Sequence, residues 1–205
     1  MEGVLESLRA EHDPCRGYCG QPTRRKGDQK TASLFCKAVE WGTMPSLEPR
    51  QFRNIMGHFA TGVTVVTTDV GGEVRGLTVN SLTSVSLDPL LVLWCLDKKT
   101  RLAEHLSDMT GYGISILASP QRDLSSYFAG QIKDGSVPVF AFEPMAGGPR
   151  IAGCVAALGC RLERVDEGGD HWILLGRVEE LYLSEAAHDP LVWFGGRYRG
   201  LSALA

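Results

Sequence analysis

Three short stretches of the sequence combine residue types that can bind a polar ligand. The first is Gly76–Ser86, where threonine, asparagine and serine side chains crowd along a segment of extended character. Hydroxyl groups and a carboxamide at this density could hydrogen-bond the edge of a flat, polar heterocycle. An edge strand with solvated hydroxyl groups would show the same composition, so the residues alone leave both interpretations open.

The second stretch gathers positive charge where a strand is expected to give way to a short helix. It runs Cys95-Leu96-Asp97-Lys98-Lys99-Thr100-Arg101. Two lysines, an arginine, a hydroxyl group and a helix N-terminus are groups that bind phosphate-like anions. A solvated run of charges is the alternative interpretation.

The third stretch is Gly169-Asp170-His171, which begins a strand after an expected turn. A carboxylate beside an imidazole can orient the ring, which can then donate a hydrogen bond to a ligand. A turn histidine that faces water is the alternative. The five histidines are dispersed and the six cysteines lack zinc-site spacing, so no metal site is predicted.

The pattern of apolar residues predicts the elements that position these stretches. Phe52, Ile55, Met56 and Phe59 have helical spacing, with Ser46 as the expected cap and Gly62 as the end. Further short helices are expected at 100–106 and 119–129. Strands are expected at 63–68, 74–87, 90–96, 113–117, 151–165, 171–183 and 191–194, and strand 90–96 is expected to be covered on both faces.

This element order predicts a mainly β fold. Helices and strands do not alternate as β-α-β units, which disfavours a doubly wound parallel sheet. A closed or partly closed antiparallel β-barrel with a few short helices is expected, because closure removes the exposed sheet edges.

Composition suggests one globular domain with an N-terminal extension. The chain has 205 residues, of which 43% are hydrophobic, and a net charge of -3. Residues 1–44 are rich in turn formers and charges and are predicted to be disordered, whereas residues 45–205 are predicted to form the domain. The acidic balance disfavours nucleic acid as a partner. No apolar run approaches the roughly 18 residues of a membrane span, so a cytoplasmic protein without membrane contact is expected.

Common catalytic and nucleotide-binding motifs are absent from the sequence. It contains neither G-x-G-x-x-G nor G-x-x-x-x-G-K-[ST], and neither G-x-S-x-G nor H-E-x-x-H. Cysteines Cys95, Cys154 and Cys160 lie in apolar runs and are expected to be buried thiols.

Several fragments, in order and spacing, resemble the flavin reductase-like family. These short-chain NAD(P)H:flavin oxidoreductases are often the small component of two-component flavin-dependent monooxygenases. The resemblance covers about residues 49–201. It is carried by the sequences at 59–68, 76–81, 85–93, 128–129, 169–171, 176–178 and 190–191.

The resemblance implies a split β-barrel that binds FMN or FAD at the interface of a homodimer. It also implies that NADH or NADPH donates a hydride and that a monooxygenase component receives the reduced flavin. His171 is implied as the catalytic residue, beside the nicotinamide. The implied flavin-binding residues are Thr78, Val79, Asn80, Ser81 and Ser84 at the ring, Cys95, Leu96, Lys99, Thr100 and Arg101 with Lys98 at the phosphate, and Phe128, Ala129 and Tyr198 beside them.

Two departures from the family pattern affect these expectations. Lys98-Lys99 stands where many relatives have Ser-Ser or Arg-Ser, which could shift the preference between FMN and FAD. Ser115 stands where relatives often have asparagine. Arg75 and Arg197 could contact the 2′-phosphate of NADPH or lie on the surface.

Three other functions stay open at the level of the sequence. The same barrel could hold flavin or haem as a non-catalytic module, or it could be an oxidase of the pyridoxamine-phosphate type. A packed barrel without any ligand is the third.

Overall fold

The computed structural model describes residues 47–186 and 188–201. The predicted extension, residues 1–44, lies outside the described residues. In chain order the elements are α1 (Pro49–Met56), β1 (Thr61–Gly62), β2 (Thr64–Val70), β3 (Glu73–Val79), β4 (Thr83–Leu87), β5 (Leu90–Asp97), η1 (Arg101–Asp108), β6 (Gly111–Ile116), η2 (Ser119–Gln121), α2 (Arg122–Phe128), β7 (Phe142–Glu143), β8 (Arg150–Ile151), β9 (Ala156–Gly168), β10 (His171–Leu183), β11 (Val192–Phe194) and β12 (Arg197–Arg199).

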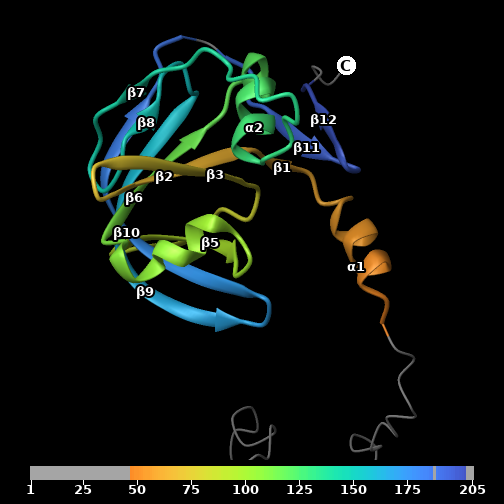
Figure 1. The fold of residues 1–205 in the computed structure, drawn as a ribbon, viewed down its shortest axis with the longest axis horizontal. Helices are drawn as coiled ribbons and strands as arrows, with labels where there is room; N and C mark the ends of the chain where they lie inside the picture. The colour runs from red at the N-terminus through yellow and green to blue at the C-terminus, as the bar shows by residue number, and fades with distance from the viewer. Residues whose placement is uncertain (1–46, 187, 202–205) are drawn as a thin grey trace, which may run out of the picture. The chain divides into compact units, whose positions relative to one another are not determined.

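A seven-stranded antiparallel sheet forms the body of the fold (Figure 1). Its strand order is β3-β2-β6-β9-β10-β5-β4, so consecutive strands β3 and β4 lie at opposite edges. Between the described strands no ladder joins these two edges. The backbone N–H of Cys95 instead donates to Ser81 Oγ at 3.0 Å, which ties the β3–β4 connection to β5. The mainly β, antiparallel class is confirmed, with the barrel left open between β3 and β4.

Several predicted element boundaries are wrong. The stretch 74–87 is two strands rather than one, because the chain crosses between sheet edges at residues 80–82. The first helix has Glu48 rather than Ser46 at its N-cap and ends at Met56. Helix 119–129 is a 3₁₀ turn followed by α2, and β12 was not predicted.

The β9–β10 hairpin and the Gly71–Gly72 hairpin were both predicted correctly. Gly71, Gly72 and Gly169 have φ between 60° and 90°, the left-handed region that only glycine enters without steric strain. The tighter turn at Gly169–Asp170 places His171 as the first residue of β10.

The main core lies on one face of the sheet. Trp94, Leu96, Tyr112 and Leu174 are fully buried there. Burial alternates along β5, so the opposite face, with Leu91, Leu93 and Cys95, is only half-buried. In the single chain, two expectations are therefore wrong: strand 90–96 is not covered on both faces, and Cys95 is not buried. Cys154 and Cys160 are buried, as predicted.

Helix α1 presents an apolar face that nothing in the described part of the chain covers. Phe52, Ile55, Met56 and Phe59, which gave the helical spacing, are all at least half exposed. Among the described helices, none is long and apolar enough to cross a membrane.

Candidate functional site

A groove follows the outer edge of β3, and most of the predicted ligand-binding residues line it. It consists of two cavities that share Ala129. We name them the Asn80 cavity, of about 250 Å³, and the Arg101 cavity, of about 540 Å³. The first is lined by Thr78, Val79, Asn80, Ser125, Trp193 and Tyr198, and the second by Arg75, Gly76, Thr100, Arg101, Tyr127 and Phe128.

The edge position of β3 explains why the groove can bind polar groups. An antiparallel edge strand pairs only alternate backbone groups, so the others point away from the sheet. β3 pairs with β2 along its whole length and has no ladder on its other side within the described chain. Its outward N–H and C=O groups are therefore available to a ligand in the groove.

Helix α2 closes one side of the groove through two contacts with β3. The hydroxyl group of Thr78 donates to the backbone carbonyl of Ser125 at 2.7 Å. The ring of Phe128 rests on Gly76, where a side chain would collide with it. Ser125 is fully buried, so this contact holds the helix close to the strand.

The predicted hydroxyl groups are largely engaged within the chain. Thr78 donates to Ser125, and Thr100 Oγ1 donates to the carbonyl of Asp97 at 2.8 Å. Ser81 Oγ accepts from the Cys95 N–H and can donate to the Cys95 carbonyl at 3.5 Å. A hydroxyl group has one proton to donate, so in these bonds Thr78 and Thr100 offer a ligand only acceptor lone pairs.

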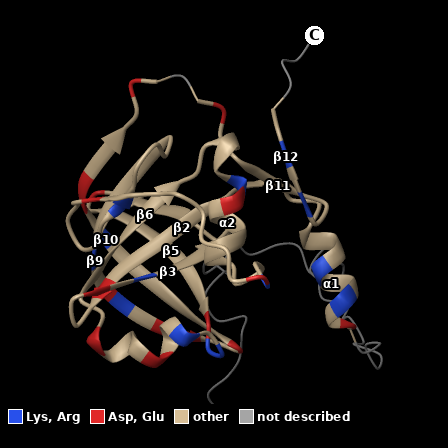
Figure 2. Cartoon of the chain, turned by 45° about the horizontal axis from the view of Figure 1, so that its top comes forward, with Lys and Arg blue, Asp and Glu red and all other residues tan. Residues whose placement is uncertain are grey.

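Asn80 differs from these residues because its side chain makes no hydrogen bond to another described residue. It lines the Asn80 cavity and also two neighbouring cavities. One neighbour lies between α1 and the β11–β12 hairpin, with Arg53 and His58 on its wall; Figure 2 shows the basic residues of α1 and β12. The other includes Phe59. The carboxamide thus stands where three openings meet.

Tyr198 lies at the side of the Asn80 cavity. Its hydroxyl group is 3.0 Å from Ser125 Oγ, and its ring packs edge-on against Trp193 with centroids 5.0 Å apart. The guanidinium of Arg122 lies 5.3 Å from the ring centroid. Ser125 and Trp193 were not predicted as site residues, since neither lies in a recognisable motif and only the tertiary fold brings them to β3.

The predicted cluster of positive charge separates in the structure. Thr100 and Arg101 line the Arg101 cavity. Lys98 instead pairs with Glu167 and lies 4.4 Å from the Trp172 ring centroid, on the β9–β10 hairpin. Its hydrogen bond and charge lower the pKa of the Glu167 carboxyl. Lys98 is therefore directed away from the groove.

Besides Lys98, His171 and five other predicted residues line neither cavity of the groove. His171 pairs with Asp97 across the β10–β5 ladder, so it shares the half-buried outer face with Cys95. Its Nδ1 lies 2.8 Å from Asp170 Oδ1, and this contact lowers the pKa of the Asp170 carboxyl. Leu96 is fully buried below that face. The remaining four are Ser81, Ser84, Cys95 and Lys99, of which Ser81 lines the neighbouring cavity that includes Phe59.

The fold is a half-open antiparallel β-barrel, and the groove on β3 is a candidate site for an elongated ligand with an anionic end. The chain belongs to the flavin reductase-like family, since the family model described as "Flavin reductase like domain" matches residues 56–202.

Similar proteins carry related names. The chain is 34% identical over 157 residues to the reductase subunit HsaB of a flavin-dependent monooxygenase from Rhodococcus jostii (strain RHA1), covering 76% of this chain and 80% of that protein. It is 40% identical over 154 residues to an NADH-dependent FAD reductase from Streptomyces globisporus, covering 73% and 84%. The structure of flavin reductase PheA2 in its native state superposes with a TM-score of 0.72 at 38% identity, covering 77% of this chain and all of that one.

Proposed function

We propose that this protein is an NAD(P)H-dependent flavin reductase that supplies reduced FMN or FAD to a partner monooxygenase. The observation that carries the proposal is the groove on β3, with a free carboxamide at one end and Arg101 at the other, in a chain of this family. Relatives named as NADH-dependent reductases favour NADH as the donor.

The chain's own residues fit a flavin bound along the groove. Asn80 and the outward backbone groups of β3 would hydrogen-bond the polar edge of the ring, and Arg101 would hold the phosphate. Reduction of flavin by a hydride creates negative charge on the ring, and donors already positioned along that edge stabilise it. The Tyr198–Ser125 contact keeps the opposite side of the cavity in place.

His171 would orient the nicotinamide. The cofactors supply the hydride chemistry, so the protein's main contribution is to bring two rings together in a fixed geometry. Asp170 holds one ring nitrogen of His171, and the other, which bonds to no described residue, would contact the ligand. The role requires that the nicotinamide approaches over the outer face of β5 and β10, the face that is half-buried in one chain.

A homodimer would cover the apolar surfaces that the single chain leaves exposed. These are the α1 face, with Phe52 and Ile55, and the outer face of β5 around Leu91, at the end of the strand away from His171. A monooxygenase that accepts reduced flavin is proposed from relatives named as reductase components of such enzymes. A cytoplasmic location stays a prediction.

The test is to mix the purified protein with FMN or FAD, add NADH or NADPH, and follow nicotinamide absorbance. Oxidation that requires added or copurified flavin is expected. A folded protein that binds flavin and oxidises neither nucleotide would instead be the non-catalytic module.

A further inference from the structure

We infer that the flavin taken by this chain is FAD rather than FMN, and that Arg75 is the residue that selects it by binding the second phosphate of the diphosphate. This inference rests on the proposed function, because it concerns the same groove. The names of similar proteins do not decide between the two flavins, since relatives named for FAD and for FMN are each 40% identical to this chain.

Two cations from different elements line the same cavity. Arg75 comes from β3 and Arg101 from the start of η1, and both line the Arg101 cavity together with Thr100. FMN ends in one phosphate, for which Arg101 and the backbone around Thr100 suffice. FAD continues through a second phosphate, and a second guanidinium beside the first is a suitable group for it, because arginine binds phosphate oxygens through paired N–H donors.

Arg75 has a donor that no other described residue uses. Its Nε atom is buried and has no hydrogen-bond partner among the described residues, while Nη2 pairs with the exposed carboxylate of Glu73 at 2.8 Å. A buried N–H without a partner is uncommon in proteins. The Arg75 side chain as a whole is 35% exposed, so a small turn of the guanidinium would bring this N–H to a phosphate oxygen in the cavity. The ion pair with Glu73 keeps the Arg75 guanidinium at the cavity wall. Because the Glu73 carboxylate is mostly exposed to water, it can give up its hydrogen bond to Nη2 when a ligand binds there.

The size and lining of the Arg101 cavity also favour the larger flavin. Its volume is about 540 Å³, compared with about 250 Å³ for the Asn80 cavity proposed for the ring. A single phosphate is much smaller than a flavin ring, so the Arg101 cavity has room for more than the phosphate of FMN. Tyr127 and Phe128 contribute aromatic rings to its wall, beside the two arginines. Aromatic rings and arginine are the groups on which an adenine base stacks.

The experiment measures the dissociation constants of FAD and FMN by quenching of flavin fluorescence. It uses the full chain and the variants Arg75→Met and Arg164→Met. Arg164 is a matched control because it pairs with Asp166 two residues along its strand, as Arg75 pairs with Glu73, but lies on β9 outside the groove. Circular dichroism and thermal melting establish that each variant is folded.

The expected result is that the unmodified chain binds FAD about tenfold or more tightly than FMN. Arg75→Met should weaken FAD binding about tenfold and FMN binding less than twofold, a loss of about 1.0–1.4 kcal/mol in selectivity by the standard conversion. Arg164→Met should change neither constant. If Arg75→Met does not fold, Arg75→Lys should lose part of the FAD preference, because an ammonium lacks the paired donors.

Three results would overturn the inference: equal affinities for FAD and FMN in the unmodified chain, a loss of both flavins alike in Arg75→Met, or no change in either. A raised KM for NADPH with unchanged FAD binding would assign Arg75 to the 2′-phosphate instead. Failure of the proposed function would differ from all of these, because the folded, unmodified chain would then bind neither flavin or oxidise no nicotinamide nucleotide.

Discussion

The ring of Phe128 lies directly against the backbone of Gly76. A Cβ atom at position 76 would come within 2.7 Å of both Cδ1 and Cε1 of that ring, closer than real Cβ contacts allow. Phe128 also packs against Phe140 and Phe142, with ring centroids 5.3 and 6.5 Å away. These two rings limit how far Phe128 can move away from Gly76. The absence of a side chain at Gly76 therefore lets the end of α2 settle on β3 and form one wall of the groove.

Replacing Gly76 by alanine should displace Phe128 and distort the Arg101 cavity. We expect a loss of stability of about 1–3 kcal/mol, typical of overpacking, and a weakening of flavin binding. Thermal melting and flavin titration measure the two effects. Gly200→Ala is the control, since apart from its chain neighbours no atom of a described residue lies within 4 Å of a Cβ there. Unchanged flavin affinity in Gly76→Ala would show that Phe128 does not shape the site.

Asn80→Ala should remove the main side-chain contact to the flavin ring. We expect kcat/KM for flavin to fall about tenfold, which corresponds to about 1.4 kcal/mol. Asn80→Asp should lower kcat further, because its carboxylate opposes the negative charge that develops on the ring during reduction. Steady-state kinetics with varied flavin provide both values. If Asn80→Ala is as active as the unmodified chain, the flavin ring does not bind at Asn80 but elsewhere in the groove.

His171→Ala should slow flavin reduction more than it weakens flavin binding, since the side chain lies outside both cavities of the groove. We expect a fall of about 10- to 100-fold in the reduction rate, a range typical of a lost orienting contact. Stopped-flow reduction by NADH and flavin titration separate the two quantities. His188→Ala, at an exposed position, is the control. Equal losses in both measurements would argue against a role at the nicotinamide.

Gly176→Ala should destabilise the core without acting through the groove. A Cβ at this position would lie 2.1 Å from Tyr112 Oη, and Tyr112 is fully buried. Overpacking of this kind costs about 1–3 kcal/mol. Tyr112→Phe should partly rescue the variant, because it removes the colliding oxygen and also a buried hydroxyl that lacks a hydrogen-bond partner among the described residues. Thermal melting of the single and double variants tests this, and failure of the rescue would contradict the packing explanation.

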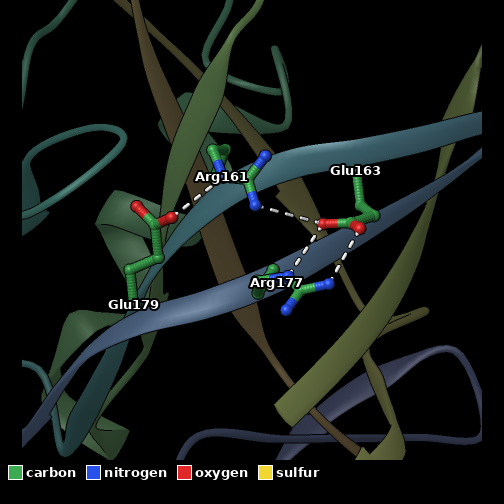
Figure 3. Close-up of polar contacts among 4 residues, drawn as sticks. All are labelled: Arg161, Glu163, Arg177 and Glu179. Carbon is green, nitrogen blue, oxygen red and sulfur yellow. Dashed lines mark hydrogen bonds and ion pairs between the residues drawn. The ribbon is translucent and has the colours of Figure 1, made fainter. Parts of the chain in front are cut away.

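Four charged residues on β9 and β10 form an exposed ion-pair network (Figure 3). Arg161 and Arg177 face each other across the ladder, an arrangement of like charges that is unfavourable by itself. Glu163 accepts two hydrogen bonds from Arg177 at 3.0 Å and one from Arg161 at 3.4 Å, while Glu179 accepts one from Arg161 at 2.9 Å. The bonds and charge of Arg177, with a smaller effect from Arg161, hold the pKa of Glu163 below its usual 4.5.

Glu163→Gln should therefore lower the melting temperature in a pH-dependent manner. Because folding lowers the pKa of Glu163, its stabilising effect is present above pH 4.5 and is lost as the pH falls through the folded-state value. The difference in melting temperature between the two proteins should shrink at acid pH and also at high salt. Glu104→Gln, at an exposed position on η1, is the control. A difference that is constant with pH would exclude the ionised carboxylate as its source.

The sequence by itself was sufficient for the class of fold and for the order of most strands. Alternating and β-branched residues predict extended segments locally, and paired glycines such as Gly71–Gly72 predict a hairpin, so these features need no knowledge of distant contacts. The same holds for the stretches around Asn80 and Arg101, because their residue types and spacing are visible in the chain and resemble a known family.

Only the tertiary structure decided which of those residues share a site. The groove brings Ser125 from α2 and Trp193 and Tyr198 from the last strands to β3, across separations in sequence that no local pattern encodes. It also directs Lys98 to Glu167 and leaves the Arg75 Nε without a partner among the described residues. Strand register determines these outcomes, since a shift of one residue reverses the face on which each side chain lies, and register is set by pairing between distant strands.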